Sequence, residues 1–194
     1  EDHDPKKGKL RSCGKAYPGI DVKIVDEKNN ELPVGGVGEI LLKGDIIMKG
    51  YWNKPEANEE SIVDGWFYTG DAGYFDDEGF LYIHDRVKDM IVSGGENVYP
   101  AEVENALMAH ENISDAAVIG IPDDKWGEAV KGIVVTNKEL ADKEIIDFVK
   151  TKIAGYKCPK SIDFAQELPR NPSGKILRRE LRAPYWKGKD RNIS

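Results

Sequence analysis

Cysteine and histidine are scarce in this chain of 194 residues, which contains two cysteines and three histidines. Cys13 and Cys158 have neither CxxC spacing nor a neighbouring histidine, so they indicate a reducing compartment rather than a disulfide framework or a zinc site. The histidines are scattered, and their positions suggest neither a catalytic triad nor a metal cluster. We therefore expect a cytoplasmic protein without a metal-ligand set in this chain.

Long apolar runs and an excess of positive charge are also missing. The longest apolar run has about five or six residues, whereas a membrane-spanning helix needs roughly 20. The first four residues, EDHD, lack the basic and apolar regions of a signal peptide. Because the chain begins without methionine, we expect it to be part of a longer protein.

The charge balance is acidic overall, with 28 Lys and Arg against 35 Asp and Glu, a formal net charge of −7. This balance argues against broad binding of nucleic acid. From Lys157 onward the balance reverses, with 10 basic residues against 4 acidic ones. This basic tail could meet a single phosphorylated small molecule.

Two halves with different patterns are present in the remaining sequence. Alternating segments at residues 21–25 and 39–44, and a hairpin at 73–83 around an Asp-Asp-Glu-Gly turn, predict a sheet or partial barrel. After about Arg86 strands alternate with helices, which predicts an α+β fold with a boundary near 85–89. The expected elements there are strands at 90–92, 113–121, 130–135 and 161–165, helices from Pro100 and across 140–153, and a helical turn at 175–181.

Three segments combine glycines with charged residues: GWFYTGD at 65–71, DRVKD at 85–89 leading into SGGENVYP at 93–100, and NPSGK at 171–175. Each has a plain structural interpretation, as a turn, a solvated charged surface or a loop. A chemical interpretation is also available. Asp71 at the tip of a strand turn could accept two hydrogen bonds from a ribose diol, and Arg86 could reinforce this contact. Lys175 could reach negative charge that develops on a phosphate.

Four motifs stand in one order along the chain: GYWNKPEA at 50–57, GWFYTGD at 65–71, SGGENVYP at 93–100 and PSGK at 172–175. In this order the chain, from about Gly14 to Arg191, resembles the C-terminal portion of an ATP-dependent acyl-CoA synthetase of the acyl-adenylate-forming superfamily. The resemblance implies a ligase that uses ATP and Mg²⁺ to convert a carboxylic acid, expected to be a fatty acid, into acyl-AMP and pyrophosphate. Coenzyme A (CoA) then displaces AMP.

The resemblance also implies a role for each matching position. The expected roles are nucleotide binding for Asp71 and Arg86, the hinge for Lys88, catalysis of adenylation for Lys175, the CoA channel for Gly94, Gly95 and Glu96, and contacts to the CoA nucleotide for Trp126, Tyr156 and Lys160. For Trp126, simple surface packing stands as an equal alternative.

One departure from the family concerns its phosphate-binding loop and its aromatic-Gly-x-Thr-Glu stretch, which do not occur in this sequence. Residues 1–85 are therefore expected to form the last subdomain, a small distorted β-barrel, of a larger N-terminal domain. Residues 86–194 are expected to form a mobile α+β C-terminal domain with its hinge near 85–89. We expect the fragment to be inactive alone.

Two alternative functions stay open: a non-catalytic module that binds CoA or an acidic partner, and an adenylation domain that loads a carrier protein. The expected ligands are ATP or AMP, CoA and a carboxylic acid, with no nucleic acid and no membrane span. A homodimer is possible on this sequence because truncated sheet edges can pair.

Overall fold

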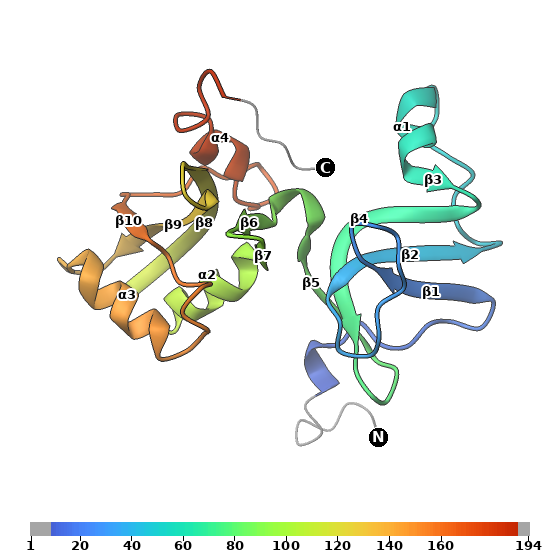
Figure 1. Ribbon diagram of the computed structural model, residues 1–194, viewed down its shortest axis with the longest axis horizontal. Coiled ribbons are helices and arrows are strands. Elements are labelled where there is room, and N and C mark those ends of the chain that lie inside the picture. Colours follow the sequence, from blue (N-terminus) through green and yellow to red (C-terminus); the bar gives the residue numbers. More distant parts are fainter. Residues whose placement is uncertain (1–8, 190–194) are drawn as a thin grey trace. The chain divides into compact units, whose positions relative to one another are not determined.

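The computed structural model describes residues 9–189, and the chain divides into two compact units between Lys88 and Asp89 (Figure 1). Each unit is built around its own five-stranded sheet. The mixed α and β composition confirms the predicted α+β class. The assignment of the units to the enzyme domains named above, and of the hinge between them, remains a prediction.

The first unit is a curled antiparallel sheet with few helices (Figure 1). The sheet order is β1-β2-β4-β3, and β5 pairs with β4. The elements are η2 (Lys9–Arg11), β1 (Ile20–Val25), β2 (Gly38–Gly44), α1 (Pro55–Ser61), β3 (Ile62–Val63), β4 (Trp66–Phe75) and β5 (Leu81–Arg86). The short helix η3 (Val87–Asp89) spans the boundary between the two units. Side chains of β1 and β2, such as Val25 and Leu41, are buried.

The predicted hairpin at 73–83 is confirmed, because β4 and β5 are antiparallel and Asp76 to Gly79 form the turn between them. The prediction that Asp71 stands at the tip of a strand turn is wrong. Asp71 lies inside β4, at an irregularity where the register against β2 shifts. The short helix α1, with Pro55 at its first position as that position favours, was not anticipated, and neither was β3.

The second unit has the sheet order β10-β9-β6-β7, with β8 paired to β9. Its β10–β9 pair is parallel and its other pairs are antiparallel. The elements are β6 (Ile91–Ser93), β7 (Glu96–Val98), α2 (Pro100–Met108), β8 (Ile113–Asp123), β9 (Gly127–Thr136), α3 (Asp142–Lys150), β10 (Ser161–Phe164) and α4 (Arg178–Arg182).

Both faces of the long β8–β9 ribbon are covered. Val118 belongs to a core that α2 and α3 complete, whereas its neighbour Ile119 belongs to a core completed by the C-terminal segment. A strand that is buried on both faces reads as a continuous apolar run, which explains the sequence AAVIGI in β8. The segment that covers the second face is the one that carries Lys175.

That C-terminal segment is held to the sheet by polar contacts as well. The Tyr185 hydroxyl donates to the Asp163 carboxylate, and Trp186 Nε1 donates to the Gly120 carbonyl at 2.9 Å. Burial and the bond to Asp163 raise the pKa of Tyr185 to about 12. The predicted helical turn at 175–181 is partly wrong: α4 begins at Arg178, so Lys175 stands on the preceding loop.

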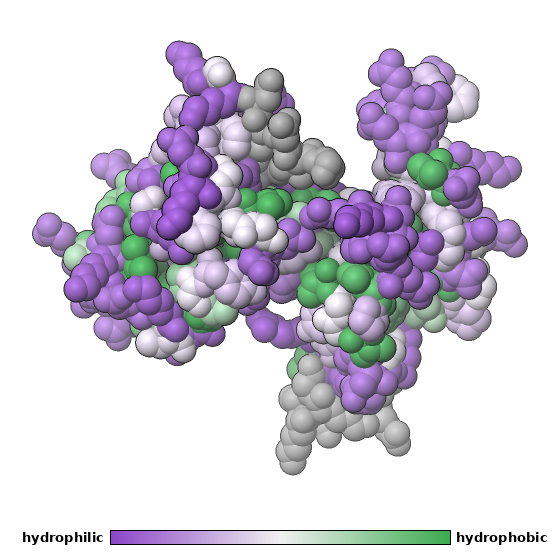
Figure 2. Space-filling view, viewed as in Figure 1, coloured by the Kyte–Doolittle hydropathy of each residue, from purple (hydrophilic) through white to green (hydrophobic). Residues whose placement is uncertain are grey.

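None of the helices within residues 9–189 has the length and apolar character needed to cross a membrane. Hydrophilic residues make up most of the surface that Figure 2 shows on both units, and hydrophobic residues form small separate groups there.

Candidate functional site

Asp71 and Arg86 face each other across β4 and β5, where they are register partners. Arg86 Nε donates to Asp71 Oδ1 at 2.8 Å, and the two side chains are 51% and 30% exposed. A carboxylate in this position keeps acceptor capacity toward solvent, and a guanidinium carries five N–H donors. The pair can therefore accept from and donate to the hydroxyls of a sugar.

The backbone around Asp71 is fixed by its neighbours. Gly70 has φ +71°, a left-handed conformation that favours glycine. Its N–H donates to Glu39 Oε1 at 2.9 Å, and Thr69 Oγ1 donates to the Ile40 carbonyl at 2.8 Å. Glu39, Thr69 and Gly70 also line a cavity of about 440 Å³, together with residues of α1 and of the loop before it.

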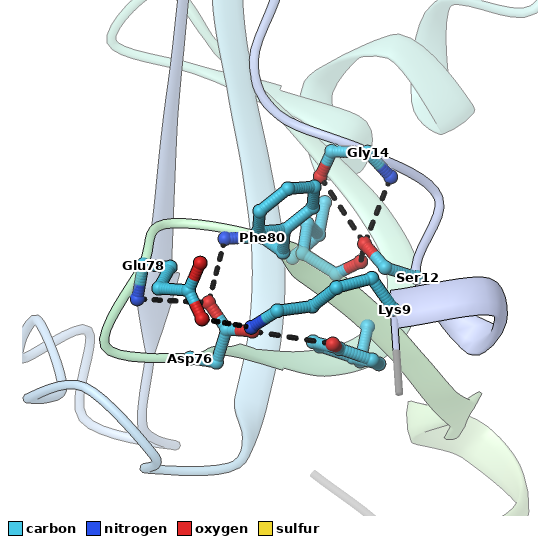
Figure 3. A network of polar contacts seen from close by, with 8 residues as sticks. Lys9, Ser12, Gly14, Asp76, Glu78 and Phe80 are labelled. Atoms are coloured by element: carbon cyan, nitrogen blue, oxygen red, sulfur yellow. Dashed lines mark hydrogen bonds and ion pairs between the residues drawn. The ribbon is translucent and has the colours of Figure 1, made fainter. Parts of the chain in front are cut away.

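The hairpin that carries Asp71 and Arg86 is tied to the start of the described chain (Figure 3). Lys9 Nζ lies 2.6 Å from Asp76 Oδ2 and 2.7 Å from Glu78 Oε1, and only 11% of its side chain is exposed. Ser12 Oγ donates to the Leu81 carbonyl at 2.8 Å. These contacts restrain the turn end of the hairpin.

The charges in this network shift the pKa values of both ends of the ion pair. The bond to Asp76 raises the pKa of Lys9. Burial alone would raise the pKa of Asp76, but the ammonium of Lys9 and the backbone N–H of Phe80 lower it to about 2. Asp76 and Lys9 therefore stay charged through the neutral range.

Lys88 is an exposed residue of η3, directly before the unit boundary. The residue that follows it, Asp89, is buried and lies 3.2 Å from Arg182 Nη2 and 3.6 Å from Arg178 Nη1. Arg178 Nη2 also lies 2.7 Å from Glu104 Oε2. This cluster joins the first residue of the second unit to α4 and α2.

Gly94 and Gly95 form the two-residue turn between β6 and β7, with φ values of +64° and +85°. Positive φ at both positions is what a type I′ hairpin turn requires. The Gly94 N–H donates to the Trp126 carbonyl at 2.8 Å, and a Cβ on Gly94 would lie 2.5 Å from Trp126 Cε3. Glu96 is exposed at the start of β7. The turn and Trp126, which is 42% exposed, thus form one surface.

Tyr156 and Lys160 stand on a different segment, between α3 and β10. Both are exposed, and Lys157 between them binds Glu102 of α2 at 2.7 Å. The backbone N–H of Lys160 donates to the Val130 carbonyl at 2.8 Å. The loop is therefore anchored while its two candidate side chains face solvent.

Lys175 is exposed on a tight loop between β10 and α4. The Asn171 side chain accepts from the backbone N–H of Lys175 at 2.9 Å, and Asn171 N–H donates to the Lys175 carbonyl at 2.9 Å. Arg170 Nη1 donates to the Gly174 carbonyl at 2.6 Å, and its Nη2 donates to both carboxylate oxygens of Asp115. A flexible ammonium is thus mounted on a loop whose backbone is fixed at several points.

Known protein families match this chain in two places. The family model described as "AMP-binding enzyme" matches residues 1–52, and the one described as "AMP-binding enzyme C-terminal domain" matches residues 102–175. The chain belongs to the AMP-binding enzyme family. Its resemblance to acyl-CoA synthetases, predicted from four motifs, is confirmed.

Two relatives show how similar in sequence this chain is to known enzymes of the family. The chain is 48% identical over 178 residues to the long-chain-fatty-acid–CoA ligase FadD13 of Mycobacterium tuberculosis, covering 91% of this chain and 35% of that protein. It is 43% identical over 194 residues to the fatty acid–[acyl-carrier-protein] ligase ScoC of Streptomyces coeruleorubidus, covering 99% and 37%. The chain thus spans little more than a third of the length of these relatives.

A solved AMP-binding enzyme agrees with the fold. The o-succinylbenzoate CoA synthetase of Bacillus subtilis, in complex with an acyl-adenylate intermediate, is 43% identical and superposes with a TM-score of 0.83 over 91% of this chain and 36% of that one. The same enzyme has been solved with ATP and a magnesium ion, at 42% identity and a TM-score of 0.81 over 90% of this chain and 36% of that one.

Some of the residues for which the sequence predicts a role in an AMP-binding enzyme contact each other in the structure, and others stand on separate segments. Asp71 contacts Arg86, and Gly94 contacts Trp126, whereas Lys175 stands on a loop of its own. Within residues 9–189 no group of three or more His, Cys, Asp or Glu is arranged to hold a metal ion. The roles of the ten residues remain predictions.

Two side chains that fix the backbone next to Asp71 and Lys175 were not identified from the sequence. Arg170 and Glu39 each act on a neighbouring backbone, at Gly174 and Gly70. Arg170 directly precedes the NPSGK motif, so its position offered a signal. Glu39 lies far in sequence from Gly70, and only the pairing of β2 with β4 brings the two together.

Proposed function

We propose that this chain is the C-terminal part of an ATP-dependent acid–thiol ligase that activates a carboxylic acid as acyl-AMP and transfers the acyl group to CoA. The adenylate-forming relatives with 43–48% identity support the reaction class. A fatty acid is the substrate we propose, and FadD13, whose name specifies a long-chain fatty acid, supports it.

The observation that carries the proposal is the presentation of Lys175. Its ammonium is exposed on a loop that Asn171 and Arg170 fix. A positive charge delivered to phosphate oxygens as the acyl–phosphate bond forms stabilises the transition state. Within the second unit this arrangement suits delivery of one cation to an anionic group.

The other residues take their proposed roles around this step. Asp71 would accept from the ribose hydroxyls while Arg86 donates to them, which fits the two polar side chains that lie side by side on β4 and β5 and are both reached by solvent. Lys88 would be the hinge. Gly94, Gly95 and Glu96 would line the CoA channel, and Trp126, Tyr156 and Lys160 would contact the CoA nucleotide. Magnesium would enter with ATP and neutralise its phosphate charge.

We propose a cytoplasmic location, which the free thiols of Cys13 and Cys158 support.

The test uses the full-length protein that contains this chain. We expect Lys175→Ala to slow the formation of acyl-AMP about 10²–10³-fold, as removal of one transition-state donor does elsewhere. Conversion of supplied acyl-AMP and CoA to the thioester should stay close to the wild-type rate. Lys187→Ala, which removes another exposed lysine, is the matched control. Adenylation at the wild-type rate in Lys175→Ala would refute the role of Lys175.

A carrier protein is a second candidate acceptor of the acyl group, because ScoC, whose name specifies an acyl-carrier-protein ligase, aligns with 99% of this chain. Parallel assays with CoA and with phosphopantetheinylated carrier protein distinguish the two. Thioester formation with CoA alone supports the first candidate, and thioester formation with the carrier alone supports the second.

A further inference from the structure

The bulge in β4 leaves a gap in the sheet hydrogen bonding next to Asp71. Leu41 pairs with Tyr68 and Glu39 pairs with Ala72, so that Ile40 of β2 stands opposite residues 69–71 of β4. Extra residues in one strand of an antiparallel pair are left out of the ladder and re-aim a side chain. The side chain re-aimed here is Asp71.

Side chains replace the missing ladder bonds. Thr69 Oγ1 donates to the Ile40 carbonyl at 2.8 Å and accepts from the Asp71 N–H at 3.1 Å. The remaining amide of the bulge, that of Gly70, donates to Glu39 Oε1 at 2.9 Å. Glu39 is thus the acceptor that fixes the left-handed residue directly before Asp71.

The charges around Glu39 suit this role. The side chain is half-buried, and no ion pair joins it to a cation among residues 9–189. Burial raises the pKa of Glu39, the Gly70 N–H opposes this shift, and the nearby Asp71 adds to it. Two carboxylates that repel each other are held in one bulge, Glu39 bonded to the backbone and Asp71 paired with Arg86.

We propose that Glu39 is a positioning residue for nucleotide binding, which holds the Gly70 amide so that Asp71 meets the ribose diol. This inference rests on the proposed function, because it assigns Asp71 to the ribose. Glu39 acts through Asp71 and does not touch the nucleotide. Its removal should therefore affect only the part of nucleotide affinity that the ribose hydroxyls supply.

The experiment measures pyrophosphate–ATP exchange by the full-length protein with ATP and with 2′,3′-dideoxy-ATP. The variants are Glu39→Ala, Glu39→Gln, Asp71→Ala and the double variant with alanine at both positions. We expect Glu39→Ala to raise KM for ATP about tenfold, the loss that a misaligned charge-assisted hydrogen bond produces, and to leave KM for dideoxy-ATP unchanged. Glu39→Gln, which keeps an acceptor oxygen for Gly70, should restore KM for ATP.

The double variant should match Asp71→Ala, because residues that act as one unit are not additive. Glu59→Ala, which removes an exposed glutamate of α1, is the control and should bind both nucleotides as the wild type does. If Glu39→Ala fails to fold, Glu39→Asp, whose shorter side chain cannot reach Gly70, replaces it, with the unfolding temperature measured in parallel.

Equal increases in KM for both nucleotides, or additive losses in the double variant, would show that Glu39 is merely structural and overturn the proposal. If Asp71→Ala keeps the preference for ATP over dideoxy-ATP, the proposed role of Asp71 fails and the role of Glu39 fails with it. If Asp71→Ala abolishes the preference while Glu39→Ala retains it, only the positioning role is overturned.

Discussion

Single residues decide how the surface formed by Trp126 and the turn at Gly94 and Gly95 is built, which we propose to bind CoA. Gly94 and Gly95 look equivalent in the sequence, and both have positive φ values. In space they differ, because a Cβ on Gly94 would lie 2.5 Å from Trp126 Cε3, whereas a Cβ on Gly95 would meet no atom within 4 Å. The chain therefore offers two substitutions with the same backbone strain and different packing.

We expect Gly95→Ala to lower the free energy of unfolding by about 1–2 kcal/mol, the cost of a left-handed L-residue. Gly94→Ala should lower it further, because Trp126 must also move. Urea unfolding of the two variants measures the difference. Equal losses would mean that Trp126 is free to shift and does not pack against the turn.

At the scale of elements, the β4–β5 hairpin shows how charge fixes a segment. Asp76 begins its turn and binds Lys9, which lies 67 positions earlier in the chain. Because the pKa of Asp76 is lowered from 3.8 to about 2 in the folded protein, its charged form stabilises the fold. This contribution is present above pH 3.8 and disappears as the pH falls toward 2.

We expect Asp76→Asn to lower the urea midpoint at pH 6, and the difference from the wild type to shrink as the pH falls from 4 toward 2. Asp77→Asn, an exposed aspartate of the same turn, controls for the loss of one negative charge. A difference from the wild type that stays constant between pH 6 and pH 2 would contradict the ion pair with Lys9.

Elements with a strong periodic pattern could be predicted from the sequence, and those fixed by distant contacts could not. The helix from Pro100 was predictable because its buried residues recur with helical spacing. The strands around 113–121 and 130–135 were predictable because they contain continuous apolar runs. The position of Asp71 inside β4 was not, because the bulge exists only against β2. The loop that carries Lys175 makes contacts that the sequence does not announce, such as that of Arg170 with Asp115, 55 positions away.

At the scale of the whole molecule, the two compact units meet along the chain at Lys88 and Asp89. Asp89 is held by Arg178 and Arg182, while Lys88 directly before it is exposed. Under the proposed function the second unit rotates between the two half-reactions. The backbone of Lys88 would be the hinge of this rotation, because Asp89 directly after it is anchored within the second unit.

We expect Lys88→Pro in the full-length protein to slow thioester formation more than adenylation, because proline fixes φ near −65° and restricts the preceding residue. Lys88→Ala removes the side chain and keeps the backbone free, so both rates should stay near those of the wild type. Single-turnover measurement of each half-reaction provides the test. Equal slowing of both steps by Lys88→Pro would indicate misfolding instead of a hinge.

The central claim is that this chain works within an enzyme that forms acyl-adenylates. Its most direct test is the exchange of labelled pyrophosphate into ATP by the folded full-length protein, with magnesium and a panel of fatty and aromatic acids. The account predicts exchange that depends on the added acid and is strongest with a fatty acid. A folded protein that exchanges no label with any of these acids would contradict it.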